Sequence, residues 1–253
     1  MTKQLEASIA RLKSGRGSII GAGLLVTEKY VLTCAHVVET AVGIRKSDEP
    51  PAEVVTLDFP FSKDRRELRA RVVYWKPALS DSSGDIAGLE LIDPLPEGAG
   101  PELLVVGEDL RGHPFQSFGF PSGREGGVWA YGQMQGRQPQ GWVQLLCDQG
   151  YRIEPGFSGT PIWDDRLNGV SGIAVAADKQ SDVRIGFMIS AQELISSWGV
   201  LRSQAQPAEE LHESYVFISY AHADHEIMQR VITQLQENGV NVWVDKRGLK
   251  AGT

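Results

Sequence analysis

Cysteine is scarce in this sequence, which has only Cys34 and Cys147 among its 253 residues. Small secreted proteins depend on several disulfides because their cores are small, and two cysteines are too few for such a scaffold. No apolar run approaches the length of about 18 residues that a membrane-spanning helix needs, and the first residues lack the apolar core of a signal peptide. We therefore expect a cytoplasmic protein without a membrane partner.

Clusters of basic residues are also absent. The formal net charge is -7, and the arginine-rich stretch at 65–71 is diluted by neighbouring acids. A surface that binds nucleic acid needs clustered Lys and Arg to contact phosphates. We expect no nucleic-acid partner, and we interpret 65–71 as a solvated strand or loop face.

Long segments with helical periodicity are missing between residues 7 and 189. Short β-prone runs alternate there with turns rich in Gly, Pro, Asp and Ser, a pattern typical of a barrel or sandwich. The runs lie at 18–20, 23–26, 30–32, 54–57, 71–75, 103–106, 116–120, 142–146, 169–175 and 184–189. The sequence thus predicts a large all-β domain.

The pattern changes at Ser190. Ser190 and Glu193 have the spacing of a capping box, and the apolar residues that follow could dock a short helix on the preceding domain. Residues 201–214 are polar and indicate a linker. We therefore expect a first domain at 1–200.

The pattern of apolar residues in the segment 215–253 indicates a second domain. An apolar run at 215–219, a stretch with apolar residues at i, i+3, i+4 and i+7, and a second run at 240–245 predict a strand, a helix and a strand. This succession begins a parallel α/β sheet. One such unit buries too little apolar surface to be stable alone.

Ser158 lies between two glycines in the sequence GFSGTP at 156–161. A serine hydroxyl becomes a good nucleophile only beside a base, a group that orients the base, and N–H donors that face the developing oxyanion. Gly156 would let the backbone turn so that the N–H groups of Gly156 and Ser158 converge. An ordinary turn between two strands would explain the same residues, so the partner residues must decide.

Two histidines occur in the first domain, His36 after an apolar run and His113 in a loop. His36 is the candidate base, and Asp85, which begins an apolar run, is the candidate orienting acid; alone, each would fit a structural role. The order His36, Asp85, Ser158 is the order found in chymotrypsin. The α/β-hydrolase order needs a His after the Ser, and the subtilisin order needs an Asp before the His. The histidines after Ser158 lie in or beyond the linker, and no Asp precedes His36.

These motifs resemble the trypsin-like serine proteases of the chymotrypsin fold, in their bacterial, disulfide-free form. The resemblance rests on GAGLLV at 21–26 leading to LTCAH at 32–36, on DIAGLEL at 85–91 and on GFSGTP at 156–161, with 185–190 resembling the closing strand of high-temperature-requirement-type proteases. It implies two six-stranded barrels with the active site in the cleft between them. His36 would accept the Ser158 proton, Asp85 would hold the His36 tautomer, and the N–H groups of Gly156 and Ser158 would form the oxyanion hole.

Phe157 departs from the digestive proteases, which carry at this position the aspartate that receives a newly cut N-terminus. Activation by N-terminal cleavage should therefore not apply. A gapless alignment on Ser158 places five residues around the primary specificity pocket, namely Arg152, Ile153, Ile173, Ala174 and Val175. The apolar members favour a small or medium apolar residue before the scissile bond, whereas Arg152, if it points inward, would favour an acidic one.

Residues 215–253 resemble the start of a Toll/interleukin-1 receptor (TIR) domain, which has a flavodoxin-like α/β fold. The resemblance rests on YVFISYAHAD at 215–224, VWVD at 242–245 and LKAG at 249–252. The catalytic glutamate of NAD-cleaving members lies beyond this part, so the resemblance does not assign NAD cleavage. His222 and His225 beside Asp224 could suggest a metal cluster, but without a third convincing ligand they are better explained as helix-start residues. We expect no metal and no cofactor.

The sequence therefore favours an intracellular serine endopeptidase that acts on a protein or peptide substrate. The fused TIR module would support TIR-TIR self-association in a bacterial stress or antiphage signalling protein. One alternative is a protease-like adaptor that binds peptides without useful turnover. Another is the sensor part of a TIR NAD hydrolase whose catalytic part is not in this sequence.

Overall fold

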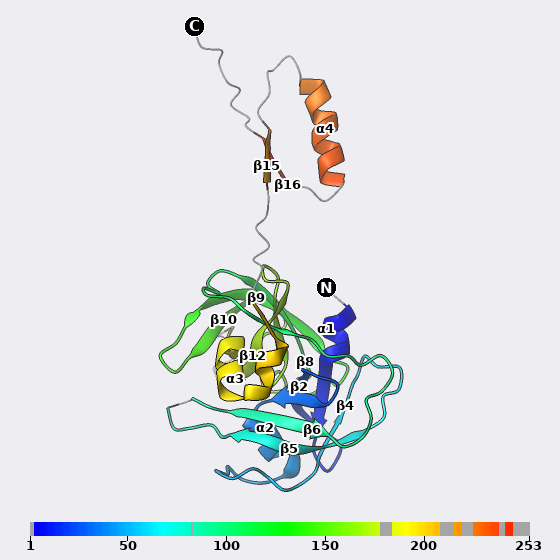
Figure 1. Ribbon diagram of the computed structural model, residues 1–253, viewed down its shortest axis with the longest axis vertical. Helices are drawn as coiled ribbons and strands as arrows, with labels where there is room; N and C mark the ends of the chain where they lie inside the picture. Colours follow the sequence, from blue (N-terminus) through cyan, green and yellow to red (C-terminus); the bar gives the residue numbers. More distant parts are fainter. Residues whose placement is uncertain are drawn as a thin grey trace. The chain divides into compact units, whose positions relative to one another are not determined.

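The computed structural model describes residues 3–81, 83–177, 184–207, 215–218, 225–237 and 241–244. The chain divides into two compact units, Met1–Glu209 and Glu210–Thr253. The first unit contains two β-barrels and the second a small α/β piece (Figure 1).

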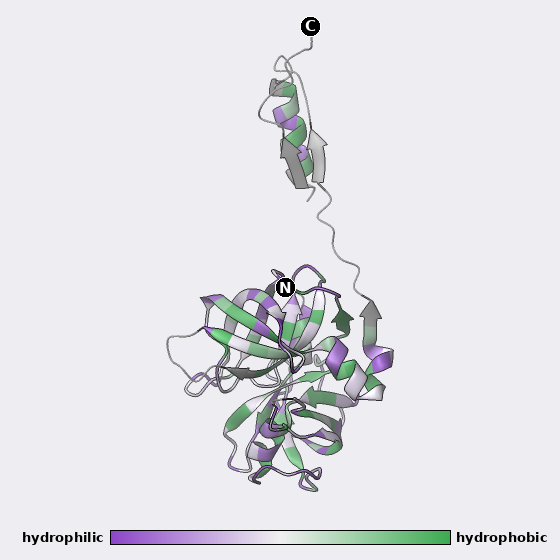
Figure 2. Ribbon diagram, turned by 90° about the vertical axis from the view of Figure 1, so that its left-hand side faces the viewer, coloured by the Kyte–Doolittle hydropathy of each residue, from purple (hydrophilic) through white to green (hydrophobic). Residues whose placement is uncertain are grey.

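Six antiparallel strands form the first barrel, which closes in the order β1-β2-β3-β6-β5-β4. Hydrophobic residues dominate several barrel strands and hydrophilic residues are interspersed in others (Figure 2), since a strand that meets water on one face carries polar residues among the apolar ones. The strands are β1 (Ile9–Lys13), β2 (Ile19–Leu25), β3 (Tyr30–Thr33), β4 (Val55–Asp58), β5 (Leu68–Lys76) and β6 (Ile86–Leu91), with helix α1 (Lys3–Ser8) before β1 and helix α2 (Ala35–Val42) after β3.

The second barrel has the order β11-β8-β9-β10-β13-β12 and closes through a pairing of β11 with β12. Its strands are β8 (Pro114–Gly119), β9 (Val128–Arg137), β10 (Trp142–Gly150), β11 (Pro161–Asp164), β12 (Gly169–Ala177) and β13 (Ile185–Ser190). Strand β7 (Leu104–Val106) joins β12 in parallel at the edge of this sheet. The prediction of two six-stranded barrels is confirmed.

Helix α3 (Ala191–Ser197) follows the second barrel. The Ser190 hydroxyl caps it by accepting a hydrogen bond of 3.4 Å from the Glu193 N–H. After the helix, the Trp198 ring stacks on Tyr74 with centroids 5.6 Å apart. A Cβ added at Gly88 of β6 would lie 2.5 Å from this ring, so the glycine makes room for it. The helix end therefore docks on the first barrel, as the apolar residues after Ser190 predicted.

The folded part of the first unit extends into the segment that we expected to be a linker. Residues Gly199–Gln204 form a 3-10 helix, η1, and Ala205–Pro207 form strand β14. Strand β14 runs parallel to β7, with Ala205 opposite Leu104. A short edge strand can be held by backbone pairing alone and needs no apolar side chains. The polar composition of this segment therefore gave no indication of the strand.

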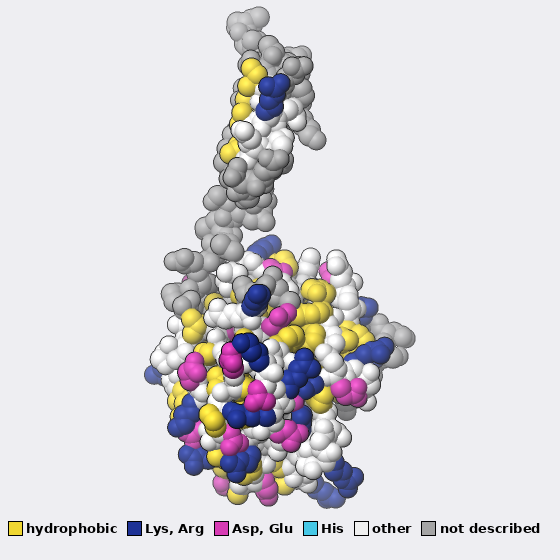
Figure 3. All heavy atoms as spheres, turned by 90° about the vertical axis from the view of Figure 1, so that its right-hand side faces the viewer, with side chains coloured by type: hydrophobic (Ala, Val, Ile, Leu, Met, Phe, Trp, Pro, Cys, Tyr) yellow, Lys and Arg dark blue, Asp and Glu magenta, His cyan; other side chains and the backbone are white. Residues whose placement is uncertain are grey.

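Acidic and basic side chains are mixed on the face shown in Figure 3. The arginines at 66–71 pair with acids, as expected for a solvated face: Arg69 bonds Asp93 at 2.8 Å and Arg71 bonds Glu90 at 2.6 Å. The hydrogen bonds from Arg69 lower the pKa of Asp93 to about 2. The positive charge of this stretch is thus largely neutralised within the molecule.

In the second unit, strands β15 (Tyr215–Ile218) and β16 (Asn241–Val244) pair in parallel, with helix α4 (His225–Glu237) between them in sequence. This is the strand, helix and strand that the sequence predicts. The other parts of the predicted motif, including His222, Asp224 and 245–253, lie outside the described residues. No helix in the described part of the chain is both long and apolar enough to cross a membrane.

Candidate active site

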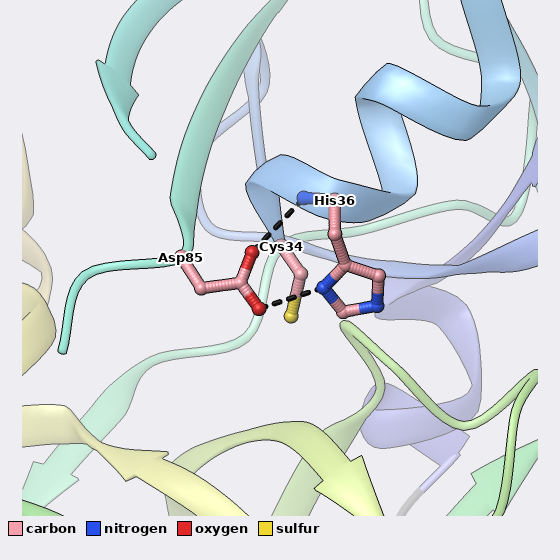
Figure 4. Close-up of side chains that lie close together, drawn as sticks. All are labelled: Cys34, His36 and Asp85. Carbon is pink, nitrogen blue, oxygen red and sulfur yellow. Dashed lines mark hydrogen bonds and ion pairs between the residues drawn. The ribbon is translucent and has the colours of Figure 1, made fainter. Parts of the chain in front are cut away.

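His36 lies in the first turn of α2, one element further along than the strand end that the sequence suggested. Its ring Nδ1 lies 2.6 Å from Asp85 Oδ2, and its backbone N–H donates to Asp85 Oδ1 at 2.9 Å (Figure 4). The first N–H groups of a helix have no partner within the helix, and Cys34 at the N-cap provides no side-chain hydrogen bond. Asp85 therefore satisfies the helix terminus and fixes the imidazole ring with one carboxylate.

Asp85 itself is buried, with 3% of its surface exposed, and has a φ of 64°. Residues other than glycine rarely adopt this left-handed conformation, although aspartate tolerates it better than most. The preceding Gly84 also has a positive φ, of 80°. This turn carries the chain into β6 and aims the carboxylate at α2, so the two hydrogen bonds from His36 offset a locally unfavourable backbone.

The Ser158 loop is tied to the first barrel through its backbone. The Ser158 carbonyl accepts a hydrogen bond of 2.8 Å from Ala22 N–H on β2. The Ala174 carbonyl on β12 accepts from Gly159 N–H at 2.7 Å and from the Cys34 thiol at 3.3 Å. These contacts bring the segments that carry His36 and Ser158 together.

The Ser158 hydroxyl is directed at the backbone of β12. Its Oγ lies 3.5 Å from the Val175 carbonyl oxygen, and among the described residues no hydrogen bond joins it to the His36 ring. Ser158 is half-buried, and the His36 side chain is 40% exposed. Rotation about the single χ1 bond of Ser158 is the motion that would redirect Oγ.

The residues before Ser158 form a tight turn. Phe157 N–H donates to the Glu154 carbonyl at 2.9 Å, and Gly156 has a φ of 105°. Proline followed by a residue with positive φ is the signature of a type II turn. A Cβ at Gly156 would lie 2.3 Å from the Phe120 carbonyl oxygen, so only glycine fits. Among the described residues, no group accepts a hydrogen bond from the N–H of Gly156 or Ser158.

Residues 16–173 match the family model of the trypsin-like peptidase domain. This span is more than half of the chain. The chain belongs to the trypsin-like peptidase family. Residues 216–253 match the family model of the TIR domain. We call Met1–Glu209 the peptidase domain and Glu210–Thr253 the TIR segment.

Solved structures share the fold of the peptidase domain. An inactive form of Rv3671c from M. tuberculosis H37Rv aligns with a TM-score of 0.57 at 19% identity, over 79% of this chain and 88% of that chain. The HtrA-type protease AlgW with a decapeptide aligns with a TM-score of 0.57 at 19% identity, over 80% and 66%. Human heparin binding protein aligns with a TM-score of 0.60 at 13% identity, over 82% and 96%. At these identities the likeness supports the fold alone. No curated protein matches the chain.

Phe157 of the peptidase domain is fully buried in the core of the second barrel. Its ring stacks on Tyr151 with centroids 6.4 Å apart, and a Cβ at Gly119 would lie 2.4 Å from it. An apolar anchor thus stands where the digestive proteases carry an aspartate. The turn that contains Gly156 is thus held by the packing of Phe157 in the second barrel.

The five residues expected around the specificity pocket differ in their surroundings. Arg152 is half-buried and pairs with Glu154 at 2.8 Å, a partner that the sequence did not indicate. Ile153 is 4% exposed and packs against Gly186 of β13. Ile173, Ala174 and Val175 are all buried in the apolar cores, and the Val175 carbonyl oxygen lies 3.5 Å from the Ser158 hydroxyl.

One set of side chains in this site is close enough together to be considered as metal ligands. The possible ligand atoms of Cys34, His36 and Asp85 all lie within 4.8 Å of one another (Figure 4). Burial, together with the charge of Asp85, raises the pKa of the Cys34 thiol well above its ordinary value. A metal would need the thiolate and would compete with the hydrogen bond between His36 and Asp85. The arrangement fits an acid and a base better than a set of ligands.

His113 lies in the loop just before β8, as expected, and it is buried there. Its Nδ1 lies 2.8 Å from Asp164 Oδ2, and Asp164 Oδ1 accepts the N–H groups of Arg166 and Leu167. The side chains of His113 and Asp164 are 5% and 0% exposed. This second histidine-aspartate pair holds the turn after β11 against the start of β8.

Proposed function

We propose that the peptidase domain is a serine endopeptidase whose nucleophile, base and orienting acid are Ser158, His36 and Asp85. One observation carries the proposal. A buried carboxylate holds Nδ1 of a partly exposed histidine at 2.6 Å, beside a serine loop in which, among the described residues, no group accepts a hydrogen bond from the N–H of Gly156 or Ser158. A structural histidine would not need a neighbouring oxyanion site, and a structural turn would not need a histidine fixed by a buried acid.

In the proposed reaction, Ser158 Oγ attacks the scissile carbonyl carbon and its proton passes to His36 Nε2. Asp85 keeps the Nδ1 proton on the ring and stabilises the imidazolium that forms. The N–H groups of Gly156 and Ser158 bind the oxyanion, which is where preorganised donors contribute most to the rate. His36 then gives its proton to the leaving amine, and a water molecule activated in the same way hydrolyses the acyl-enzyme.

The wider proposal is a cytoplasmic peptidase in a bacterial stress or antiphage signalling protein, in which the TIR segment supports self-association. The match of 216–253 to the TIR domain supports the signalling part. Cys34 and Cys147 are both free and buried, which is compatible with a reducing compartment. The substrate side of the proposal is a protein or peptide that places a small or medium apolar residue before the scissile bond, against Ile153 and Val175.

A fluorophosphonate probe tests the nucleophile, because it reacts only with a serine that a neighbouring base activates. We expect labelling of the 253-residue chain and its loss in Ser158→Ala. Ser203→Ala is the matched control, since Ser203 is exposed and bonds only neighbouring residues in η1. Labelling that persists in Ser158→Ala would refute the assignment.

One observation favours the adaptor as a second candidate. Among the described residues, the Ser158 hydroxyl bonds the Val175 carbonyl and makes no hydrogen bond with His36. If this arrangement persists when peptide is bound, the domain would hold peptides without cleaving them. Peptide binding without labelling by the probe, measured on the same preparation, would support the adaptor against the enzyme.

A further inference from the structure

A groove of about 680 Å³ lies beside the proposed oxyanion site. It contains Pro155 and Gly156 of the turn before Ser158, together with apolar residues of β2 and of the loop after β8. Three cations and one acid also line it, namely Arg11, Lys13, Arg16 and Glu125. Among the side chains that line the groove, cations thus outnumber acids, whereas the whole chain carries a net charge of -7.

In the proposed reaction, this groove would lie on the leaving-group side of Ser158. The acyl side of a bound peptide would meet Ile153 and Val175, and neither residue lines the groove. The groove is instead bounded by the first half of β2, whose Ala22 N–H bonds the Ser158 carbonyl. Strand β2 pairs with β3 only at Leu24 and Leu25, which leaves its first half an edge that faces the Ser158 loop. A free edge can accept an extended peptide as an added strand.

The geometry of β2 also fixes how far the groove reaches. An extended peptide advances about 3.3 Å per residue, as a strand does. The substrate residues after the scissile bond would therefore lie beside β2, one residue for each residue of the strand, from Ala22 back to Ile19. The next substrate residues would reach the turn that carries Arg16. The second to fourth residues after the scissile bond are the ones that the groove would contact.

Two of the cations are held in place by a buried acid. Arg11 bonds both oxygens of Asp58, at 2.7 and 2.8 Å, and Lys13 bonds the same carboxylate at 2.8 Å. Their side chains are only 16% and 14% exposed, and that of Asp58 is 2% exposed. Lys13 also reaches the exposed Glu67 at 3.0 Å. Two fixed cations thus converge on one buried anion at the wall of a hollow, where charges act more strongly than on a flat surface.

Arg16 differs from these two. It is exposed in the turn before β2, and among the described residues no carboxylate lies within ion-pair distance of its guanidinium. It provides an uncompensated positive charge where the peptide would leave the groove. The apolar part of the groove, which includes Ile19, Ile20 and Phe120, would contact the stems of the substrate side chains.

We infer that this groove selects substrates with an acidic residue at the second to fourth position after the scissile bond. The inference rests on the proposed endopeptidase function and adds a requirement on the leaving side of the substrate. It places Arg16, with support from Arg11 and Lys13, as the determinant of that preference. Attraction between Arg16 and a substrate carboxylate would be screened by salt, so the preference should decline as ionic strength rises.

Matched peptides test the inference. Internally quenched peptides with Val before the scissile bond would carry either Glu or Gln at the second, third or fourth position after it, because Gln keeps the shape and removes the charge. We expect kcat/KM to be about two- to fivefold higher for Glu at one of these positions in low salt. In Arg16→Glu the ratio should fall to about one or below.

Arg202→Glu is the control variant. Arg202 is exposed in η1 and does not line the groove, and its substitution by Glu changes the net charge by the same amount as Arg16→Glu does. The Glu to Gln ratio should be unchanged in this control variant. Arg11 and Lys13 are poor choices for this test, since removing either would leave Asp58 buried with less compensation. A Glu to Gln ratio near one in the wild-type chain, with cleavage intact, overturns the inference and leaves the endopeptidase proposal standing. A preference that survives in Arg16→Glu overturns the assignment to this groove.

A binding measurement separates the two proposals if no peptide is cleaved. The same fluorescent peptide pairs would be titrated against Ser158→Ala. Tighter binding of the Glu peptides, lost when Arg16→Glu is added, supports the groove even though the endopeptidase proposal has failed. Equal binding of the Glu and Gln peptides overturns the inference.

Discussion

The peptidase domain has two histidine-aspartate pairs of nearly the same local geometry. His36 Nδ1 lies 2.6 Å from Asp85, and His113 Nδ1 lies 2.8 Å from Asp164. In both pairs the aspartate is buried and also accepts backbone N–H groups. The difference is in the histidine: the His36 side chain is 40% exposed and the His113 side chain 5%. In the proposed reaction, a buried acid that orients an imidazole is not enough, because the second ring nitrogen must also be accessible next to the nucleophile.

Replacing each histidine by glutamine should give the largest contrast. His36→Gln removes the proposed base, and we expect turnover to fall on the order of 10⁴-fold or more with little change in stability. His113→Gln leaves a buried Asp164 oxygen without its partner, which should cost about 1–3 kcal/mol of unfolding free energy. Its turnover per folded molecule should stay within about twofold. Peptide cleavage and urea denaturation measure the two effects, and equal loss of turnover in both variants would contradict the distinction.

The aspartates provide the next test. In Asp85→Asn the amide can no longer stabilise an imidazolium and favours the wrong tautomer, so turnover should fall about 10³- to 10⁴-fold. In Asp164→Asn the remaining amide oxygen can still accept the N–H groups of Arg166 and Leu167. We expect a loss of about 1–2 kcal/mol of stability there, and little change in rate. Should Asp164→Asn prove the slower enzyme, the second pair would need a role in the reaction.

The third test disturbs the oxyanion turn and leaves both pairs intact. Gly156→Ala would place a Cβ 2.3 Å from the Phe120 carbonyl oxygen and strain a φ of 105°. We expect turnover to fall about 10²-fold, because the Gly156 N–H would be displaced from the oxyanion. Gly141→Ala is the matched control, since Gly141 has a φ of 92° and no atom within 4 Å of an added Cβ. The two variants would share the backbone strain, so similar rates in both would show that displacement of the N–H is not the cause.

The smallest effect is expected at Cys34, which lies beside the first pair only. Burial, aided by the charge of Asp85, raises the pKa of its thiol, so the reactive thiolate should be rarer than for an ordinary cysteine until the pH rises well above the usual range. Burial also raises the pKa of Cys147. We expect the folded chain to resist iodoacetamide at pH 8 and to react after denaturation, as mass spectrometry would record. Rapid modification of native Cys34 would show that the region behind His36 opens to solvent.

Much of the fold was predictable because chain order and apolar runs carry the necessary information. Strand β9 was not predicted, because Gly132, Gly136 and several polar residues lower its strand propensity. The sheet itself maintains this strand through pairing with β8 and β10. Gly132 is required there, since a Cβ would lie 1.9 Å from the Leu146 carbonyl oxygen. Such a close approach between strands cannot be read from composition.

The proposed nucleophile, base and acid could be identified from their order, but their immediate surroundings could not. The turn conformation of Asp85 and the burial of His113 depend on packing across the barrels. The cations of the groove were missed because they lie far from Gly156 in sequence and meet it only when the barrels form. The partner of Arg152 is two residues away, yet the sequence alone did not indicate which of its neighbours it would contact.

The hydrogen bond from Ala22 to the Ser158 carbonyl bears on how the peptidase domain could be divided into two fragments. Together with the contact between Cys34 and Ala174, it joins elements of the two barrels at the reacting centre. A cut in the connection between β6 and β7 would leave the base and acid on one fragment and the nucleophile on the other. Mixing the two fragments would restore activity only as they associate. Because association is bimolecular, the rate at which activity returns would depend on the concentrations of both fragments.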